Sequence, residues 1–125
     1  MKKGFTLIEV LIVVIILGIL ATIAVPQFTR VVERARRGEA LTCMAGIQTG
    51  QRIYSLDMSI FTNNIAELDA VIANNKYWAY NMAGANATAF NIRATRSGSA
   101  WVGQTILLNQ NGLWAGTYEF VPSNN

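Results

Sequence analysis

One carboxylate stands alone in the most apolar stretch of this sequence. Glu9 is the only charged residue between positions 5 and 25, a run of twenty-one residues dominated by Ile, Leu and Val. A carboxylate in a hydrocarbon environment is costly unless a cation or a set of hydrogen-bond donors compensates it. The chemistry expected of Glu9 is therefore pairing, and an acid in such a setting is interpreted as functional.

The sequence offers little for catalysis or for binding metals and cofactors. It contains no histidine and one cysteine, Cys43, so a Ser-His-Asp arrangement, an intrachain disulfide and a thiolate metal site are excluded. No glycine-rich phosphate-binding loop is present. The net charge of +3 includes Lys2 and Lys3, and without these two residues eight basic and seven acidic residues remain. We therefore expect no enzyme, no cofactor, no catalytic or metal site, and no nucleic-acid partner.

The run that carries Glu9 is long enough to cross a membrane. Twenty-one helical residues reach ~31 Å, close to the ~30 Å hydrocarbon thickness of a bilayer. A cleaved secretory signal would have a shorter apolar region and a small-residue cleavage site. A buried core helix of this length rarely lacks polar residues. We favour a retained span over residues 5–26, preceded by a basic leader at residues 1–4, with the other two interpretations left open.

Two residues are predicted to weaken this helix. Gly18 costs up to ~1 kcal/mol in a helix interior, and Pro26 removes the hydrogen bond to the carbonyl of Thr22. Apolar residues continue at helical spacing over residues 27–56, so Pro26 indicates a kink and not an end. The pattern predicts one nearly continuous helix from about residue 6 to about residue 56, with an amphipathic second half.

In the remainder of the chain apolar and polar residues alternate with a period of two, which is typical of strands. A short surface helix is expected at residues 64–73, and strands at residues 77–82, 89–95, 105–109 and 113–120. Asn111-Gly112 favours a type I′ hairpin turn between the last two strands. The predicted fold class is α+β: the long helix, membrane-embedded in its first half, packs through its second half on a small antiparallel sheet of three or four strands. Residues 27–125 would form this second domain.

The N-terminal motif resembles that of a known family. The run KKGFTLIE at residues 2–9, followed by the apolar stretch, is similar to the signal of type IV pilins and type II secretion pseudopilins. The likeness is dense over residues 1–28, looser to residue 41 and only architectural beyond about residue 56. Major pseudopilins hold calcium in their C-terminal region, but after Asp69 only Glu119 is acidic, so such a site is not expected here.

The resemblance implies a maturation and assembly pathway. A prepilin peptidase would cut between Gly4 and Phe5 and methylate the new Phe5 amine, where glycine lets the backbone lie close to a protease. The precursor would wait in the inner membrane until an assembly platform and a cytoplasmic ATPase draw it into a helical homo-oligomeric filament, extracellular or periplasmic. Glu9 would form an intersubunit salt bridge with the Phe5 amine and set the subunit register. In pili of this family the N-terminal helix of the subunit often unwinds between the positions matching Gly18 and Pro26.

The orientation in the membrane follows from the family and not from charge. Two lysines precede the span, and four arginines lie within residues 30–37 after it, which alone favours a cytoplasmic C-terminal side. The family places the C-terminal domain outside, and we follow it.

Three functions remain open. The first, which we favour, is a structural subunit of a type IV pilus-like filament made by self-association of the N-terminal helices, with adhesion, motility and DNA uptake all left open as its role. The second is a pseudopilin of a type II secretion system, and the third is a minor or tip pilin whose globular domain binds a ligand. Nothing in residues 57–125 decides among them.

Overall fold

The computed structural model describes residues 3–70, 72, 76–98 and 100–124 and divides into two compact units. Unit 1 comprises residues 1–35 and unit 2 comprises residues 36–125. The first two residues of the predicted leader lie outside the described residues.

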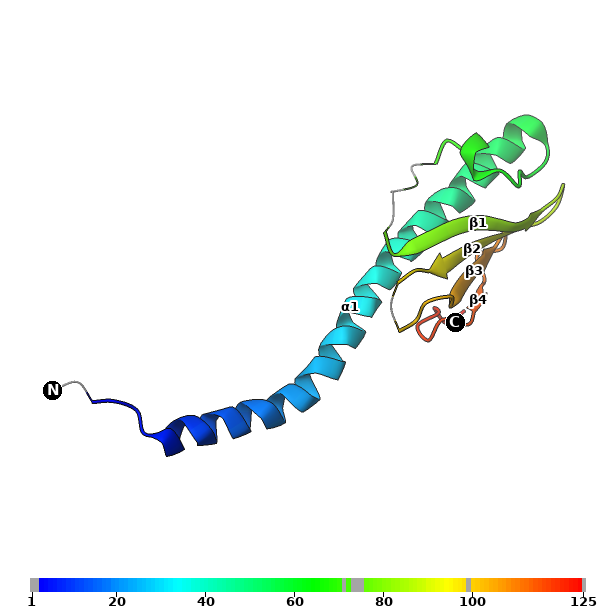
Figure 1. The fold of residues 1–125 in the computed structure, drawn as a ribbon. Coiled ribbons are helices and arrows are strands. Elements are labelled where there is room, and N and C mark those ends of the chain that lie inside the picture. Colours follow the sequence, from blue (N-terminus) through cyan, green and yellow to red (C-terminus); the bar gives the residue numbers. More distant parts are fainter. Residues whose placement is uncertain (1–2, 71, 73–75, 99, 125) are drawn as a thin grey trace. The chain divides into compact units, whose positions relative to one another are not determined.

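One helix, α1 (Leu7–Met58), runs from unit 1 into unit 2 (Figure 1). Its 52 residues confirm the predicted continuous helix, with both bounds within two residues of the expectation. Pro26 lies inside it and does not end it. Thr29 donates its hydroxyl hydrogen to the carbonyl of Pro26 at 2.9 Å. This bond adds to the helical turn after Pro26 and does not replace the one that proline removes at the Thr22 carbonyl.

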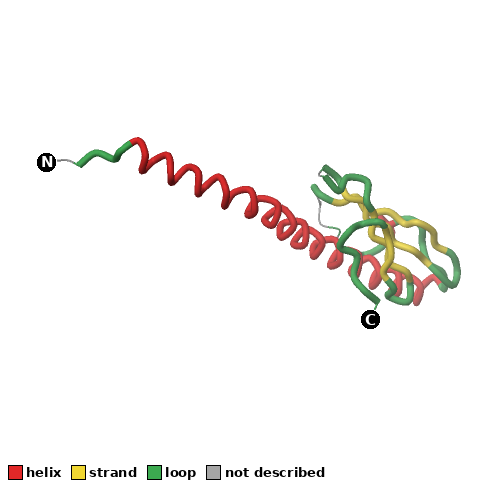
Figure 2. The backbone as a smooth tube through the Cα atoms, turned by 90° about the horizontal axis from the view of Figure 1, so that it is seen from below, coloured by secondary structure: helices red, strands yellow, loops and turns green. Residues whose placement is uncertain are grey.

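Unit 2 contains a four-stranded antiparallel sheet with strand order β1-β2-β3-β4. The strands are β1 (Trp78–Ala85), β2 (Phe90–Arg96), β3 (Thr105–Asn109) and β4 (Trp114–Gly116). Each pairs with its neighbour in sequence, with Trp78 opposite Arg96, Thr95 opposite Thr105 and Leu108 opposite Trp114. Figure 2 shows these strands against the red turns of α1. The predicted α+β class is confirmed.

The core of unit 2 lies between α1 and one face of the sheet. Ala40, Met44 and Ile47 recur at helical spacing on the buried stripe of α1 and are fully buried. The sheet contributes every second residue of its two central strands to this core, because successive side chains of a strand point to opposite faces. These buried sheet residues are Phe90, Ile92, Ala94, Ile106 and Leu108.

The predicted surface helix at residues 64–73 is wrong in extent. The structure forms only a 3-10 turn, η1 (Ile65–Glu67), which is capped by Asn64. The chain becomes extended at Leu68, whose side chain is buried in the core and stands 3.3 Å from the Cβ position that Gly50 lacks. Burial of Leu68 therefore outweighs the local helix preference. Residues 71 and 73 of the predicted helix lie outside the described residues.

The β3–β4 turn also differs from the prediction. A type I′ turn needs a positive φ at both central residues, and only Gly112, at φ 81°, has one. The Asn109 side chain organises the loop, since its oxygen accepts from the backbone N–H groups of Asn111 and Leu113 at 3.0 and 2.9 Å. An Asx-type turn therefore replaces the expected hairpin turn.

Buried Gln51 holds the loop that follows α1. Its side-chain amide donates to the carbonyl of Thr62 at 2.6 Å and accepts from the Thr62 N–H at 3.0 Å. The Thr62 hydroxyl in turn donates to the Glu67 carboxylate at 2.6 Å, and Asn64 donates to the other carboxylate oxygen at 3.3 Å. The bond from Thr62, followed by that from Asn64, holds the pKa of Glu67 below its ordinary value of 4.5.

This network predicts an acid-sensitive stability of unit 2. A carboxyl group whose pKa is lower in the folded chain stabilises the fold above its unfolded pKa, and that contribution is lost as the pH falls through the folded value. Melting temperatures of the full chain in detergent should therefore drop below about pH 4.5, and Glu67→Gln should reduce the drop. Asp57→Asn, which removes an exposed carboxylate of α1, is the control. Equal acid sensitivity of Glu67→Gln and the wild type would contradict the prediction.

Candidate functional site at the start of α1

Glu9 and Thr6 form a reciprocal capping arrangement at the first turn of α1. The backbone N–H of Glu9 donates to the Thr6 hydroxyl at 3.3 Å. The backbone N–H and the hydroxyl of Thr6 both donate to Oε2 of Glu9, at 2.8 and 2.9 Å. This is a capping box, in which the residue before the helix and the third helical residue satisfy each other's N–H groups. Glu9 therefore stabilises the helix start within its own chain.

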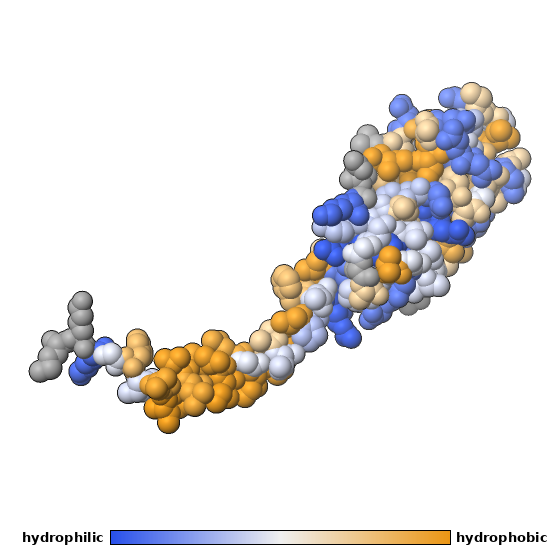
Figure 3. Space-filling model, viewed as in Figure 1, coloured by the Kyte–Doolittle hydropathy of each residue, from blue (hydrophilic) through white to orange (hydrophobic). Residues whose placement is uncertain are grey.

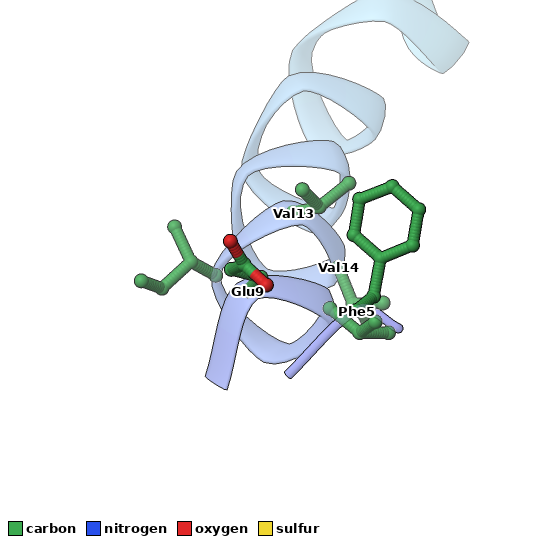
Figure 4. Close-up of a pocket in the computed structure, with 6 residues that line it drawn as sticks. Phe5, Glu9, Val13 and Val14 are labelled. Atoms are coloured by element: carbon green, nitrogen blue, oxygen red, sulfur yellow. The ribbon is translucent and has the colours of Figure 1, made fainter. Parts of the chain in front are cut away.

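The structure does not join Glu9 to Phe5. Within the described residues the hydrogen bonds of Glu9 go to Thr6, and Figure 4 shows the Phe5 ring and the Glu9 carboxylate lying apart at the helix start. With the leader attached, the Phe5 nitrogen is an amide and carries no charge. Thr6 was not among the predicted site residues, although a Thr followed three residues later by Glu is itself the signature of a capping box.

The surface around this site is apolar and unpartnered. An 18-residue window of α1 has a mean hydropathy of 3.0 and is not buried at all, so α1 is long and apolar enough to cross a membrane. A shallow groove of about 560 Å³ is lined by Phe5, Glu9 and the apolar residues Val10, Ile12, Val13 and Val14. Figure 3 shows this segment as continuously hydrophobic. A helix that is apolar on all sides requires a membrane or the interior of an assembly.

Gly4 lies before α1, and Gly18 and Pro26 lie within it. Gly4 precedes the helix in an exposed, irregular segment, so the Gly4–Phe5 peptide bond is reachable by an enzyme. A Cβ on Gly4 or on Gly18 would meet no atom within 4 Å. Gly18 and Pro26 are both exposed and both inside α1, and neither interrupts it.

The described residues offer no metal cluster. No three His, Cys, Asp or Glu side chains of this part of the chain come close enough together to hold an ion.

Comparison with known proteins places the N-terminal motif in a family. The model described as the prokaryotic N-terminal methylation motif matches residues 1–25. The chain is 38% identical over 71 residues to type II secretion system core protein G of Vibrio cholerae, covering 57% of this chain and 49% of that protein. It is 32% identical over 84 residues to the type IV major pilin protein PilA of Myxococcus xanthus, covering 67% and 38%. Fimbrial protein EcpC of Eikenella corrodens is 39% identical over 77 residues, covering 61% and 50%.

These matches confirm the resemblance to type IV pilins and secretion pseudopilins. The aligned part of the chain spans half or less of the length of these relatives.

Proposed function

We propose that this chain is a structural, non-enzymatic subunit of a type IV pilus-like filament. The observation that carries the proposal is the combination of one carboxylate with a helix start that is apolar on every exposed side. A membrane covers such a surface before assembly, and equivalent helices of other copies cover it afterwards. The methylation motif and the pilin relatives support the same function.

Maturation begins at the exposed Gly4–Phe5 bond. A prepilin peptidase removes residues 1–4 and methylates the new amine of Phe5. The processed subunit stays in the inner membrane until a platform protein and a cytoplasmic ATPase extract it. Weak helix positions at Gly18 and Pro26 allow α1 to unwind locally in the filament.

The mature chain is expected to begin at Phe5 and to carry one methyl group on its nitrogen. Intact-mass and N-terminal fragment spectra of the purified filament subunit measure this directly. Gly4→Val is expected to leave residues 1–4 attached, because a branched side chain obstructs the approach of the protease to the backbone. Gly38→Val, at an exposed helical glycine, is the control. A wild-type subunit that retains residues 1–4 would contradict the proposed maturation.

Glu9 then acquires a second partner. Both hydrogen bonds from Thr6 use Oε2, so Oε1 is the oxygen proposed to accept the methylated ammonium of Phe5 from a neighbouring copy. The ammonium exists only after cleavage, so the ion pair and the axial register that it selects become available only to processed subunits. Inside a dry bundle such a pair is favourable when both partners are present, and costly when one is missing.

A pseudopilin of a type II secretion system is the second candidate. The 38% identity to core protein G of V. cholerae favours it. Electron microscopy of sheared filaments with mass spectrometry of their contents separates the two candidates. Abundant surface filaments made of this chain support a pilus, whereas deletion that blocks protein secretion without removing surface filaments supports a pseudopilus.

A further inference from the structure

One end of unit 2 gathers cations from three separate segments. Arg36 is the first residue of this unit, and its carbonyl accepts the indole N–H of Trp78 at 3.0 Å. Trp78 pairs with Arg96 across β1 and β2, so the start of β1 and the end of β2 lie at the same end as Arg36. Lys76 belongs to the turn that leads into β1.

These cations surround the ring of Tyr77. The Arg36 guanidinium lies 4.1 Å from the ring centroid, the Arg96 guanidinium 5.3 Å and the Lys76 ammonium 6.0 Å. Arg96 is buried and donates to the Tyr77 carbonyl at 2.8 Å, so it belongs to the framework of the fold. Arg36 is half-buried and Lys76 is exposed. Arg36 therefore stacks on Tyr77 near the surface, and the Lys76 ammonium lies at the limit of the cation–π range from the same ring.

An apolar tip lies at the same end, in the loop between β2 and β3. Val102 is 64% exposed, and Trp101 beside it is half-buried. The loop is held by backbone hydrogen bonds from Gly103 to Arg96 at 2.9 Å and from Gln104 to Trp101 at 3.2 Å. The Trp101 indole N–H donates to the carboxylate of Glu119 at 2.9 Å. The exposure of Val102 is therefore imposed by a fixed turn.

We propose that this end of unit 2, defined by Arg36, Lys76, Trp101 and Val102 and called the base, docks on anionic phospholipid head groups before assembly. Val102 and Trp101 enter the interfacial layer, where tryptophan is favoured. Lys76 and Arg36 contact lipid phosphates. The inference rests on the proposed function, because it needs residues 5–26 to be held in the same bilayer.

Chain connectivity and charge argue for lipid as the occupant. Arg36 follows Pro26 by ten residues of α1, a rise of ~15 Å along a helix. The head-group layer extends ~5–8 Å beyond the hydrocarbon, and long basic side chains reach further toward it. The Glu119 carboxylate, which accepts the Trp101 indole N–H, adds one negative charge beside the three cations Arg36, Lys76 and Arg96. A cationic and apolar surface that chain connectivity joins to the proposed membrane anchor through ten helical residues fits an anionic bilayer.

A fluorescent label on the base tests the docking. The full chain carrying Cys43→Ser and Val102→Cys, labelled with an environment-sensitive dye, is reconstituted in vesicles with or without phosphatidylglycerol. The emission should shift to the blue in the anionic vesicles only, and added salt should reverse the shift because it screens the charges. Leu113→Cys in the same background is the control, since Leu113 is 49% exposed in the turn at the other end of β3. Its label should stay in water.

Charge variants test which side chains recognise the lipid. Lys76→Gln should lower the ratio of docked to undocked base by ~5-fold, the effect of one basic residue near an anionic surface. Arg52→Gln, which removes an exposed cation elsewhere on α1, should leave the ratio unchanged. Equal effects of the two substitutions would overturn the assignment.

The remaining outcomes separate this inference from the proposed function. If alkaline carbonate strips the chain from the vesicles, residues 5–26 do not anchor it, and both the span and the docking are overturned. If the chain is retained and the Val102→Cys label reports water, docking alone is overturned. A shift that grows with the ratio of protein to lipid would show contact between copies, and a shift unchanged in neutral vesicles would show that phosphate is not recognised. Either result overturns the inference.

Discussion

Replacing Glu9 by alanine is expected to lower filament assembly at least ~100-fold while the chain stays in the membrane. Removing one partner of a buried ion pair costs about 3–5 kcal/mol, because the other charge is left without compensation. Each 1.4 kcal/mol corresponds to a factor of ten in an equilibrium. The amounts of subunit in sheared filaments and in the membrane fraction, measured by quantitative immunoblot, report the two pools. Glu39→Ala, at an exposed acid on the same helix, should assemble normally.

Two further substitutions separate the capping role of Glu9 from its charge. Glu9→Gln keeps an acceptor for the Thr6 N–H and so preserves the capping box, but it cannot pair with an ammonium. Thr6→Ala removes the capping hydroxyl, at a cost of ~1 kcal/mol, and keeps the carboxylate. We expect Glu9→Gln to assemble nearly as poorly as Glu9→Ala. Thr6→Ala should lower the amount of assembled filament only ~5-fold. Normal filaments from Glu9→Gln would show that the charge of Glu9 is not needed.

Gly116→Ala is expected to destabilise unit 2 by ~3 kcal/mol or more. A Cβ on Gly116 would lie 2.1 Å from the carbonyl oxygen of Thr105 and 2.9 Å from its carbonyl carbon. Both atoms belong to the backbone and cannot rotate away. The same carbonyl accepts the N–H groups of Thr117 and Tyr118 at 3.0 and 3.1 Å, so moving it would also break the bonds that end β4. The φ of 134° at Gly116 adds backbone strain for any other residue.

Thermal unfolding of the full chain in detergent measures this loss. For a unit of this size a cost of ~3 kcal/mol corresponds to a decrease in Tm of ~12 °C or more. Gly98→Ala is the matched control, because Gly98 also has a positive φ, of 62°, but a Cβ there would meet no atom within 4 Å. It should cost only ~1 kcal/mol. Equal losses in the two variants would show that strain alone, and not the contact with Thr105, makes Gly116 necessary.

The spacing of apolar residues over a few neighbouring positions predicts most of the secondary structure of this protein. The apolar run and the helical spacing after Pro26 predict α1 to within two residues at each end, because both signals depend on neighbours one turn away. Alternation over residues 89–95 places β2 almost as observed, and the prediction for β3 matches Thr105–Asn109. Glu9 is also predicted from its sequence neighbours alone, because a single carboxylate in an apolar run is recognisable without knowledge of the fold.

The errors occur where distant segments determine the conformation. Local pattern extended the last strand to residue 120, whereas β4 ends at Gly116 because the chain turns back onto the Thr105 carbonyl. The helix expected after residue 64 stops at Glu67 because Leu68 packs into a core built by α1 and the sheet.

The sequence by itself determined an apolar helix with one acid at its start, followed by an amphipathic half and an antiparallel sheet. These features follow from the order of residue types along a few turns or one strand. Only the tertiary structure decided the close approach at Gly116 and the gathering of Arg36, Lys76 and Arg96 around one tyrosine ring. Arg36 and Arg96 lie sixty positions apart in the chain, so no local spacing predicts that they meet at the same ring. Strand pairing and helix packing bring them together.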